Sequence, residues 1–312
     1  MSRARKVSLP YDRSCPVIYD NDDHRDTYTD EFLLALASAG EIDLRGIITT
    51  TPCGIDNPLV PQEDFDAFVA GRAEIVAKAR RSGLRNLPDP VAGPCRALRR
   101  PPSSRIEDTL PIDTPGSRLI VEEAQSADPN APLVILTGGP LTAVADAYLL
   151  DPGIAEHVVV ASLLGTCDDM GDYNGATDPW AAYIVVERLR YVQFPGGCGP
   201  ARVPKARLRE LPDTELRQWM IEKHHPTNSL PAEQDADGPP AISLVRPDYV
   251  LGMRPIAFSH FQEARGNRSV PVFRVGGTGR ATVVIDVSSE VATAEFWRAL
   301  GNPAAYHPRR DW

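Results

Sequence analysis

The sequence lacks three features that would each indicate a common class of protein. It has no basic excess, since 42 acidic residues outnumber 33 basic ones, and a net charge of -9 argues against non-specific binding to nucleic acid or an anionic membrane. Its five cysteines are widely spaced without a CxxC pair, which favours neither a zinc site nor a disulfide framework. No apolar run approaches the roughly 18 residues of a membrane span, and the first residues lack the apolar core of a signal peptide. We therefore expect a cytoplasmic protein.

What the sequence does contain is an alternation of short apolar runs with stretches of helical periodicity. This alternation predicts an α/β fold: a single domain over residues 1–312 with a doubly wound, mostly parallel sheet and helices on both faces. Proline- and charge-rich stretches near 84–115 and 195–240 are predicted surface insertions. The predicted strands are 16–20, 44–50, 132–137, 157–164, 191–194, 270–275 and 281–286, and the predicted helices are 30–40, 64–83, 116–127, 140–150, 178–189 and 213–225.

An unusually acidic segment follows the first predicted strand. Function gathers beyond the carboxyl ends of strands in an open α/β sheet, so this turn is a candidate site. Asp30 and Glu31 fall in the first turn of the next predicted helix, where acids complement the helix dipole. Asp20 and Asp22 have no such explanation, and their repulsion predicts a cation; oxygen ligands suit Ca²⁺ or Mg²⁺ rather than zinc. A solvated loop is the alternative. The acids are Asp20, Asp22, Asp23, Asp26, Asp30 and Glu31.

Two further turns at strand ends combine glycine with polar residues. In "ILTGGPLTAVADAYLLDP", two glycines after a strand permit a tight turn, and Pro140 suits a first helical position. In "GDYNGATDPWAA", Asp178 is the predicted N-cap of a helix. Asp172 and Asn174 offer an acceptor and an amide, a pair suited to holding vicinal sugar hydroxyls.

Taken in order, these segments resemble the motifs of the inosine/uridine-preferring nucleoside hydrolase family. "YDNDDHRDTYTDEFLLALA" is similar to that family's first strand with its DxDxxxDD-type loop, and "RGIITTTPCGIDN" to its "GITT" strand with a nearby Asn. "LTGGPLTA" is similar to its "TGPLTN" turn, "DYNGATDPWAA" to its "EFNxxxDPxAA" segment, and "ADGPPAISLVRPDYV" to its late "HDPLA" helix start. The order and approximate spacing match over roughly residues 16–290.

The resemblance implies hydrolysis of the N-glycosidic bond of a ribonucleoside or related ribosyl compound at a Ca²⁺ site. Carboxylates near the ribose would stabilise an oxocarbenium-like transition state, and the ion would activate a water whose proton passes to an Asp. The implied substrate is a small nucleoside-like molecule, the implied role is purine or pyrimidine salvage, and a homo-oligomer is the implied assembly.

Matched position by position, the family's motifs assign roles to residues of this chain. Asp22 would bind the metal and act as the base. The implied metal ligands are Asp20, Asp22, Glu31, Asp237 and the backbone carbonyl of Thr137 or Gly138. The implied substrate contacts are Asp30, Asn57, Asp172 and Asn174.

The chain also departs from the family's pattern. Its first loop is about four residues longer, so Asp26, whose spacing to Asp30 equals the family's, is an alternative base to Asp22. Glu31 stands where an Asp normally chelates, and Asp172 where a Glu is usual. Ala236 fills the position of the His that can assist the departing base. The base pocket of this chain is therefore expected to differ from the family's.

Two residues of the first loop are further candidates by their position alone. His24 lies among the acids and could serve as an acid catalyst, with an exposed loop histidine as the alternative. Tyr28 lies beside the acid pair and could line the pocket.

Two other functions fit parts of the sequence. A haloacid-dehalogenase-type phosphatase would use Asp20 as nucleophile and Asp22 as acid/base, but it needs a lysine near the phosphate, and no convincing one lies between "LTGG" and Asp172. The other is a catalytically impaired protein that only binds ribosyl ligands.

Overall fold

A nine-stranded sheet forms the centre of the computed structural model. The structure describes residues 7–22, 27–52, 62–128, 130–166, 170, 172–223, 233–264, 268–276 and 280–307, and it describes the backbone alone for 62–64, 264 and 268. The strand order is β10-β9-β11-β6-β5-β4-β1-β2-β3, parallel from β3 to β11, with β9 and β10 antiparallel at one end. The strands are β1 Pro16–Asn21, β2 Asp43–Thr49, β3 Pro90–Ala92, β4 Leu133–Thr137, β5 Val158–Leu163, β6 Arg190–Phe194, β9 Val250–Ala264, β10 Arg268–Val275 and β11 Ala281–Val287; β7 Ala201–Arg202 and β8 Gln234–Asp235 form a separate pair.

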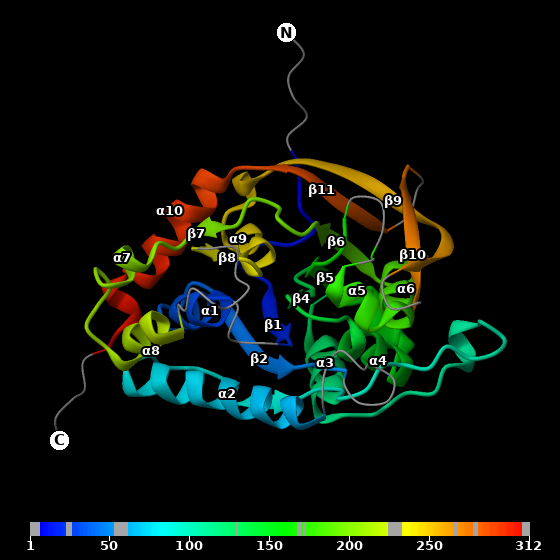
Figure 1. Ribbon diagram of the computed structural model, residues 1–312, viewed down its shortest axis with the longest axis horizontal. Coiled ribbons are helices and arrows are strands. Elements are labelled where there is room, and N and C mark those ends of the chain that lie inside the picture. The colour runs from blue at the N-terminus through cyan, green and yellow to red at the C-terminus, as the bar shows by residue number, and fades with distance from the viewer. Residues whose placement is uncertain are drawn as a thin grey trace, which may run out of the picture.

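Helices cover both faces of the sheet, which confirms the predicted fold class. Figure 1 shows α1, α9 and α10 on one side of the central strands and α3, α4 and α6 on the other. None of the helices in the described ranges is long and apolar enough to cross a membrane. The helices are α1 Thr29–Ser38, α2 Gln62–Arg81, α3 Pro115–Ser126, α4 Thr142–Leu150, α5 Tyr173–Thr177, α6 Pro179–Arg188, α7 Lys205–Leu208, α8 Glu215–Lys223, α9 Gly238–Val245 and α10 Ser289–Leu300, with 3₁₀ turns η1 Ile106–Asp108, η2 Pro152–Glu156, η3 Pro247–Tyr249 and η5 Pro303–Ala305.

Each of the predicted strands is present within two residues of its expected ends, but two strands of the central sheet were missed and one was misassigned. Segment 270–275 belongs to β10, which pairs antiparallel with β9 rather than in parallel. The 15-residue β9 was missed because exposed and half-buried residues interrupt its apolar pattern. The three-residue β3 is too short to show a pattern of its own.

The alternation of side chains along β1 decides which face of the sheet each polar residue at its end joins. Val17 and Tyr19 pack into the core that contains Phe32 of α1, and Ile18 packs into the opposite core. Successive side chains of a strand point to opposite faces. Asp20 therefore lies on the face of Ile18, and Asn21 lies on the face of Tyr19.

The second proline-rich insertion, 195–240, is not the surface excursion that its composition predicted. It contains β7, α7, α8 and β8, and the side chains of Leu208, Leu216 and Met220 are buried in the main core. Helix α8 packs against α2, and β7 against α10. Apolar residues at helical spacing bury one side of this insertion, and the insertion thereby carries its charged residues to the carboxyl end of β1.

Candidate functional site

The glycine turn after β4 lies in close contact with the end of β1. A Cβ atom on Gly139 would lie 2.7 Å from the backbone nitrogen of the half-buried Asp22, and one on Gly138 would lie 2.8 Å from both Cβ and Cγ of Asp237. Neither glycine could therefore carry a side chain without a shift of its neighbours. The two glycines thus allow two segments to pack closely against the turn after β4: the end of β1 contacts Gly139, and the start of α9 contacts Gly138.

The side-chain amide of Asn21 connects Asp22 with Asp237, which lie far apart in the sequence. Its Nδ2 donates to Asp237 Oδ2 at 3.0 Å and to the hydroxyl of Tyr19 at 2.8 Å, while its Oδ1 accepts from the backbone N–H of Asp22 at 2.9 Å. Asp237 is 8% exposed. The structure therefore brings together Asp22 and Asp237, two of the residues that the sequence assigned to one site.

The predicted sugar-binding pair lies at the same edge, where its polar atoms contact the backbone. Asn174 Nδ2 donates to the carbonyl oxygen of Gly138 at 2.6 Å, one of the two carbonyl oxygens that were candidates to bind a metal. Asp172 caps α5: one of its carboxylate oxygens accepts from Gly175 N at 2.9 Å and the other from Gly165 N at 2.7 Å. Both side chains are half-buried, and both fix the loops around the edge of the sheet.

The acid pair at the start of α1 is buried and faces two buried cations. Asp30 Oδ2 lies 3.6 Å from a guanidinium nitrogen of Arg72, and the side chains are 1% and 0% exposed. Glu31 Oε1 lies 2.7 Å from Lys223 Nζ, and those side chains are 0% and 4% exposed. Burial raises the pKa of Glu31, and the charge of Lys223 opposes that rise. Asp30 and Glu31 are thus compensated by side chains of the protein itself.

Sequence reasoning missed Arg72 and Lys223, although each leaves a signal. Arg72 lies on the buried stripe of α2 between Phe68 and Ile75, and Lys223 follows Met220 on the buried stripe of α8. A charged residue at a helical position that otherwise faces the core is buried only with a partner. That rule predicts a buried acid opposite each of these cations.

Asp235 was also missed, because the late motif was matched to Asp237. Its side chain is fully buried, and Oδ1 accepts from Thr27 Oγ1, Thr29 Oγ1 and the backbone N–H of Tyr28 at 2.7–2.9 Å. Burial raises the pKa of Asp235, and these donors and the charge of Lys223 oppose the rise. Asp235 therefore anchors the insertion to the start of α1.

Asp20 differs from the other buried acids. It lies in register with Thr137 of β4, is 1% exposed, and neither of its oxygens has a hydrogen-bond partner among the described residues. Burial raises its pKa to about 7, while Thr50 and Arg72 nearby oppose that rise. A carboxyl group enclosed in this way is not placed to attack a phosphoryl group.

The remaining predicted site residues divide between the core and the part of the chain that is not described. Tyr28 is 1% exposed; its ring packs edge-on against Phe296 and lies 4.8 Å from Lys223 Nζ. It therefore contacts the acid pair from within the core. His24, Asp26 and Asn57 lie outside the described residues.

Three members of the predicted ligand set already have partners within the protein. Glu31 is bound to Lys223, the carbonyl of Gly138 accepts from Asn174, and Asp237 accepts from Asn21. Within the described ranges, no three His, Cys, Asp or Glu side chains are grouped so that they could hold a metal ion. Calcium binding thus stays a prediction, and we derive no chemical step through the ion.

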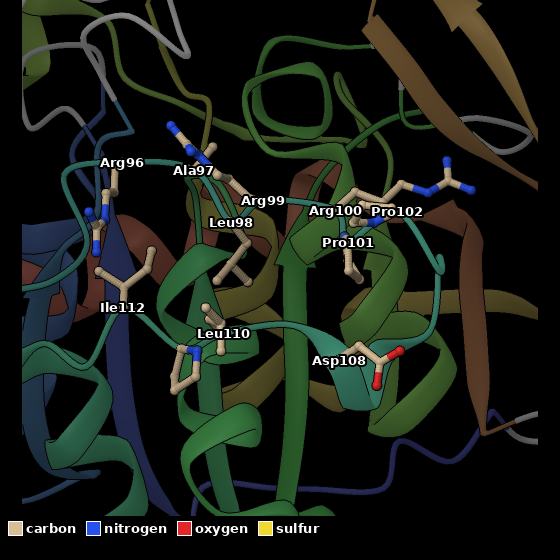
Figure 2. Close-up of a pocket in the computed structure, with 11 residues that line it drawn as sticks. Arg96, Ala97, Leu98, Arg99, Arg100, Pro101, Pro102, Asp108, Leu110 and Ile112 are labelled. Atoms are coloured by element: carbon tan, nitrogen blue, oxygen red, sulfur yellow. The ribbon is translucent and has the colours of Figure 1, made fainter.

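Two cavities lie beside the first insertion, away from the acids. The larger has a volume of about 580 Å³ and is lined by residues from Arg96 to Ile112, as Figure 2 shows. The smaller, about 330 Å³, shares four of these residues and is also lined by Trp180 and Phe261. No predicted site residue lines either cavity. In Figure 2 the side chains of Arg96 and Arg100 lie at opposite ends of the labelled group.

Comparison with known proteins places the fold among nucleoside hydrolases. No protein-family model matches the chain, and no curated protein sequence matches it. Among solved structures, a plant nucleoside hydrolase is 18% identical with a TM-score of 0.63, over 93% of this chain and 99% of the other. An inosine-guanosine nucleoside hydrolase is 13% identical with a TM-score of 0.64, over 94% and 100%. The type III effector protein XopQ, solved with adenosine diphosphate ribose, is 14% identical with a TM-score of 0.57, over 95% and 96%. The chain therefore has a nucleoside hydrolase-like fold.

Proposed function

We propose that this protein hydrolyses the N-glycosidic bond of a ribonucleoside or a related ribosyl compound at the carboxyl edge of its sheet. The observation that carries the proposal is the meeting of Asp22 and Asp237 on either side of the Gly138–Gly139 turn, with Asn174 bound to the same turn. Solved nucleoside hydrolases that share the fold over nearly their whole length support the same reaction class.

In the proposed reaction Asp22 acts as the base. Water forms a bond from its oxygen to the anomeric carbon while its proton passes to Asp22. The glycosidic C–N bond breaks, its electron pair goes to the departing base, and solvent protonates that base. The carboxylates of Asp22 and Asp237 stabilise the positive charge that develops on the sugar. Asp22 is half-buried, so it keeps access to water that the fully enclosed Asp20 lacks.

Release of free base from a panel of ribonucleosides, followed by liquid chromatography, tests the proposal. Asp22→Asn should lower turnover at least about 100-fold, the usual range for a lost general base. Asp43→Asn is the matched control, because Asp43 is an exposed acid at the start of β2 that pairs with Arg45. Equal turnover in the two variants would remove Asp22 from the reaction.

A second candidate function is binding of a ribosyl ligand without turnover. Ala236 lies between Asp235 and Asp237, where the resembling family has a histidine that assists the departing base, and an alanine can donate no proton. The solved complex of XopQ with adenosine diphosphate ribose suggests one ligand to test. Calorimetric binding of adenosine or adenosine diphosphate ribose, with no adenine released over hours, would support this function over hydrolysis.

A further inference from the structure

The ammonium group of Lys223 lies among the oxygen atoms at the start of α1. Its Nζ is 2.7 Å from Glu31 Oε1 and donates to the carbonyl oxygen of Thr27 at 2.6 Å. The ring of Tyr28 faces it at 4.8 Å, and the lysine side chain is 4% exposed. Lys223 comes from the second insertion, 195–240, and the acidic motif after β1 gives no reason to expect that insertion at the start of α1.

These contacts are of the kinds that a hard metal ion would use. Calcium binds carboxylate and backbone carbonyl oxygens, and Lys223 holds one of each, from Glu31 and from Thr27. An ammonium group and a divalent ion would repel each other strongly in so enclosed a place. The oxygen of Glu31 therefore serves Lys223 or an ion, and not both.

Lys223 and Asp235 also share a partner, because Lys223 Nζ donates to the carbonyl oxygen of Thr27 and Thr27 Oγ1 donates to Asp235. The charge of Lys223 acts on Asp235, whose Oδ1 is held by the hydroxyls of Thr27 and Thr29. A buried carboxylate is costly without a positive partner. One lysine thus lies near acids from two segments that are about two hundred residues apart. A bound metal ion can likewise join carboxylates from distant segments.

We infer that Lys223 is an internal cation that takes the place of a divalent ion beside Glu31 and Asp235, so that the acid site assembles without calcium. The inference concerns the same edge of the sheet as the proposed function, but it does not rest on turnover, because its readouts are calcium binding and melting temperature. Loss of the hydrolase proposal would therefore leave it standing, and the reverse also holds.

The unmodified protein provides the first test. Its melting temperature should be the same in a chelator as in millimolar calcium, and calorimetry with calcium should show no stoichiometric binding. A rise of several degrees with calcium, or one bound ion per chain, would overturn the inference without recourse to any variant.

Removal of the ammonium group provides the second test. Lys223→Met keeps much of the side-chain volume, frees the oxygens of Glu31 and Thr27, and should acquire a melting temperature that calcium raises by several degrees. Lys78→Met is the matched control: Lys78 also pairs with a glutamate, Glu74, at 3.2 Å and lies 5.5 Å from the ring of Trp219, but its side chain is 23% exposed. That control should not respond to calcium. If a folded Lys223→Met variant also fails to respond, the ammonium group does not replace an ion and the inference is wrong.

Discussion

Two regions of this protein bury aspartate or glutamate in different ways. At the start of α1, Asp30 and Glu31 face the charged groups of Arg72 and Lys223. Around α4 and α6, Asp146 and Asp178 are equally buried, but their described partners are backbone N–H groups and hydroxyls. Both sets of acids are satisfied, one by ion pairs and the other by dipoles.

The dipole-bound acids hold the first insertion against the core. Asp178 accepts from Leu98 N and Thr142 Oγ1 at 2.8 Å and from Ala181 N at 3.0 Å, so it joins the loop to both helices. Asp146 accepts from Ile112 N at 2.6 Å and Asp113 N at 3.0 Å. Hydrogen bonds from several fixed donors stabilise a buried carboxylate without a counter-ion. These acids therefore close a long proline-rich loop.

The ion-paired acids lie next to the strand ends where function is expected. A buried ion pair is a poor source of stability compared with apolar packing, because both charges lose their hydration. The comparison therefore suggests the hypothesis that charge near α1 serves a purpose other than folding, whereas charge near α4 and α6 serves the architecture. The following predictions test this difference, from the largest expected effect to the smallest.

Removing a buried cation should have the largest effect. Arg72→Met should lower the free energy of unfolding by about 3–5 kcal/mol, because it leaves Asp30 buried without its partner and removes the donor to the carbonyl of Ile48. Chemical denaturation measures the loss. Arg81→Met on the same helix is the control, since Arg81 pairs with Glu74 and Glu215 at the surface and its loss should lower the free energy of unfolding far less. Similar losses in the two variants would contradict the distinction between buried and exposed pairs.

Asp20 is compensated only in part, by the nearby Thr50 and Arg72, and this should appear in the pH dependence of stability. Its pKa rises from 3.8 to about 7 on folding, so the folded protein keeps a proton that the unfolded chain releases in that range. The free energy of unfolding should therefore fall as pH rises from about 4 to 7, by up to about 4 kcal/mol from this group. Asp20→Asn should remove that part of the slope. An unchanged slope would mean that Asp20 is ionised in the folded protein.

Breaking a dipole-bound acid should have an intermediate effect. Asp178→Ala should lower the free energy of unfolding by about 2–3 kcal/mol, because donors on Leu98, Thr142 and Ala181 lose one acceptor. Proteolysis of the 93–112 loop should also accelerate, which limited digestion would reveal. Asp151→Ala is the control: Asp151 caps the exposed turn η2, so its loss should cost about 1 kcal/mol and leave the loop resistant.

The smallest effect is expected at Arg298, which is partly exposed and whose buried partner Glu295 also pairs with Arg246. Arg298 contacts both Glu41 and Glu295 at 2.6–2.9 Å, but its side chain is 43% exposed. Arg298→Ala should therefore lower the free energy of unfolding by about 1 kcal/mol or less, and salt should remove most of the difference. A loss as large as that of Arg72→Met would mean that exposed and buried ion pairs contribute equally to the free energy of unfolding.

By itself the sequence predicted seven of the nine strands of the central sheet and several of the helices that alternate with them, and it proposed one edge of the sheet as the site. Apolar runs such as 16–20 and 132–137 are local signals, and they predicted β1 and β4 because burial on both faces demands continuous apolar residues. The crowding of acids after β1 and the double glycine after β4 were local signals too.

Only the tertiary structure decided what compensates those acids. Lys223 reaches Glu31 across nearly two hundred residues, and Asp237 reaches Asn21 across 216. No local pattern encodes which cation meets which acid, because the partner is fixed by how an insertion packs on the core. The sequence could show that negative charge gathers here, while the choice between a metal ion and a lysine depends on long-range packing.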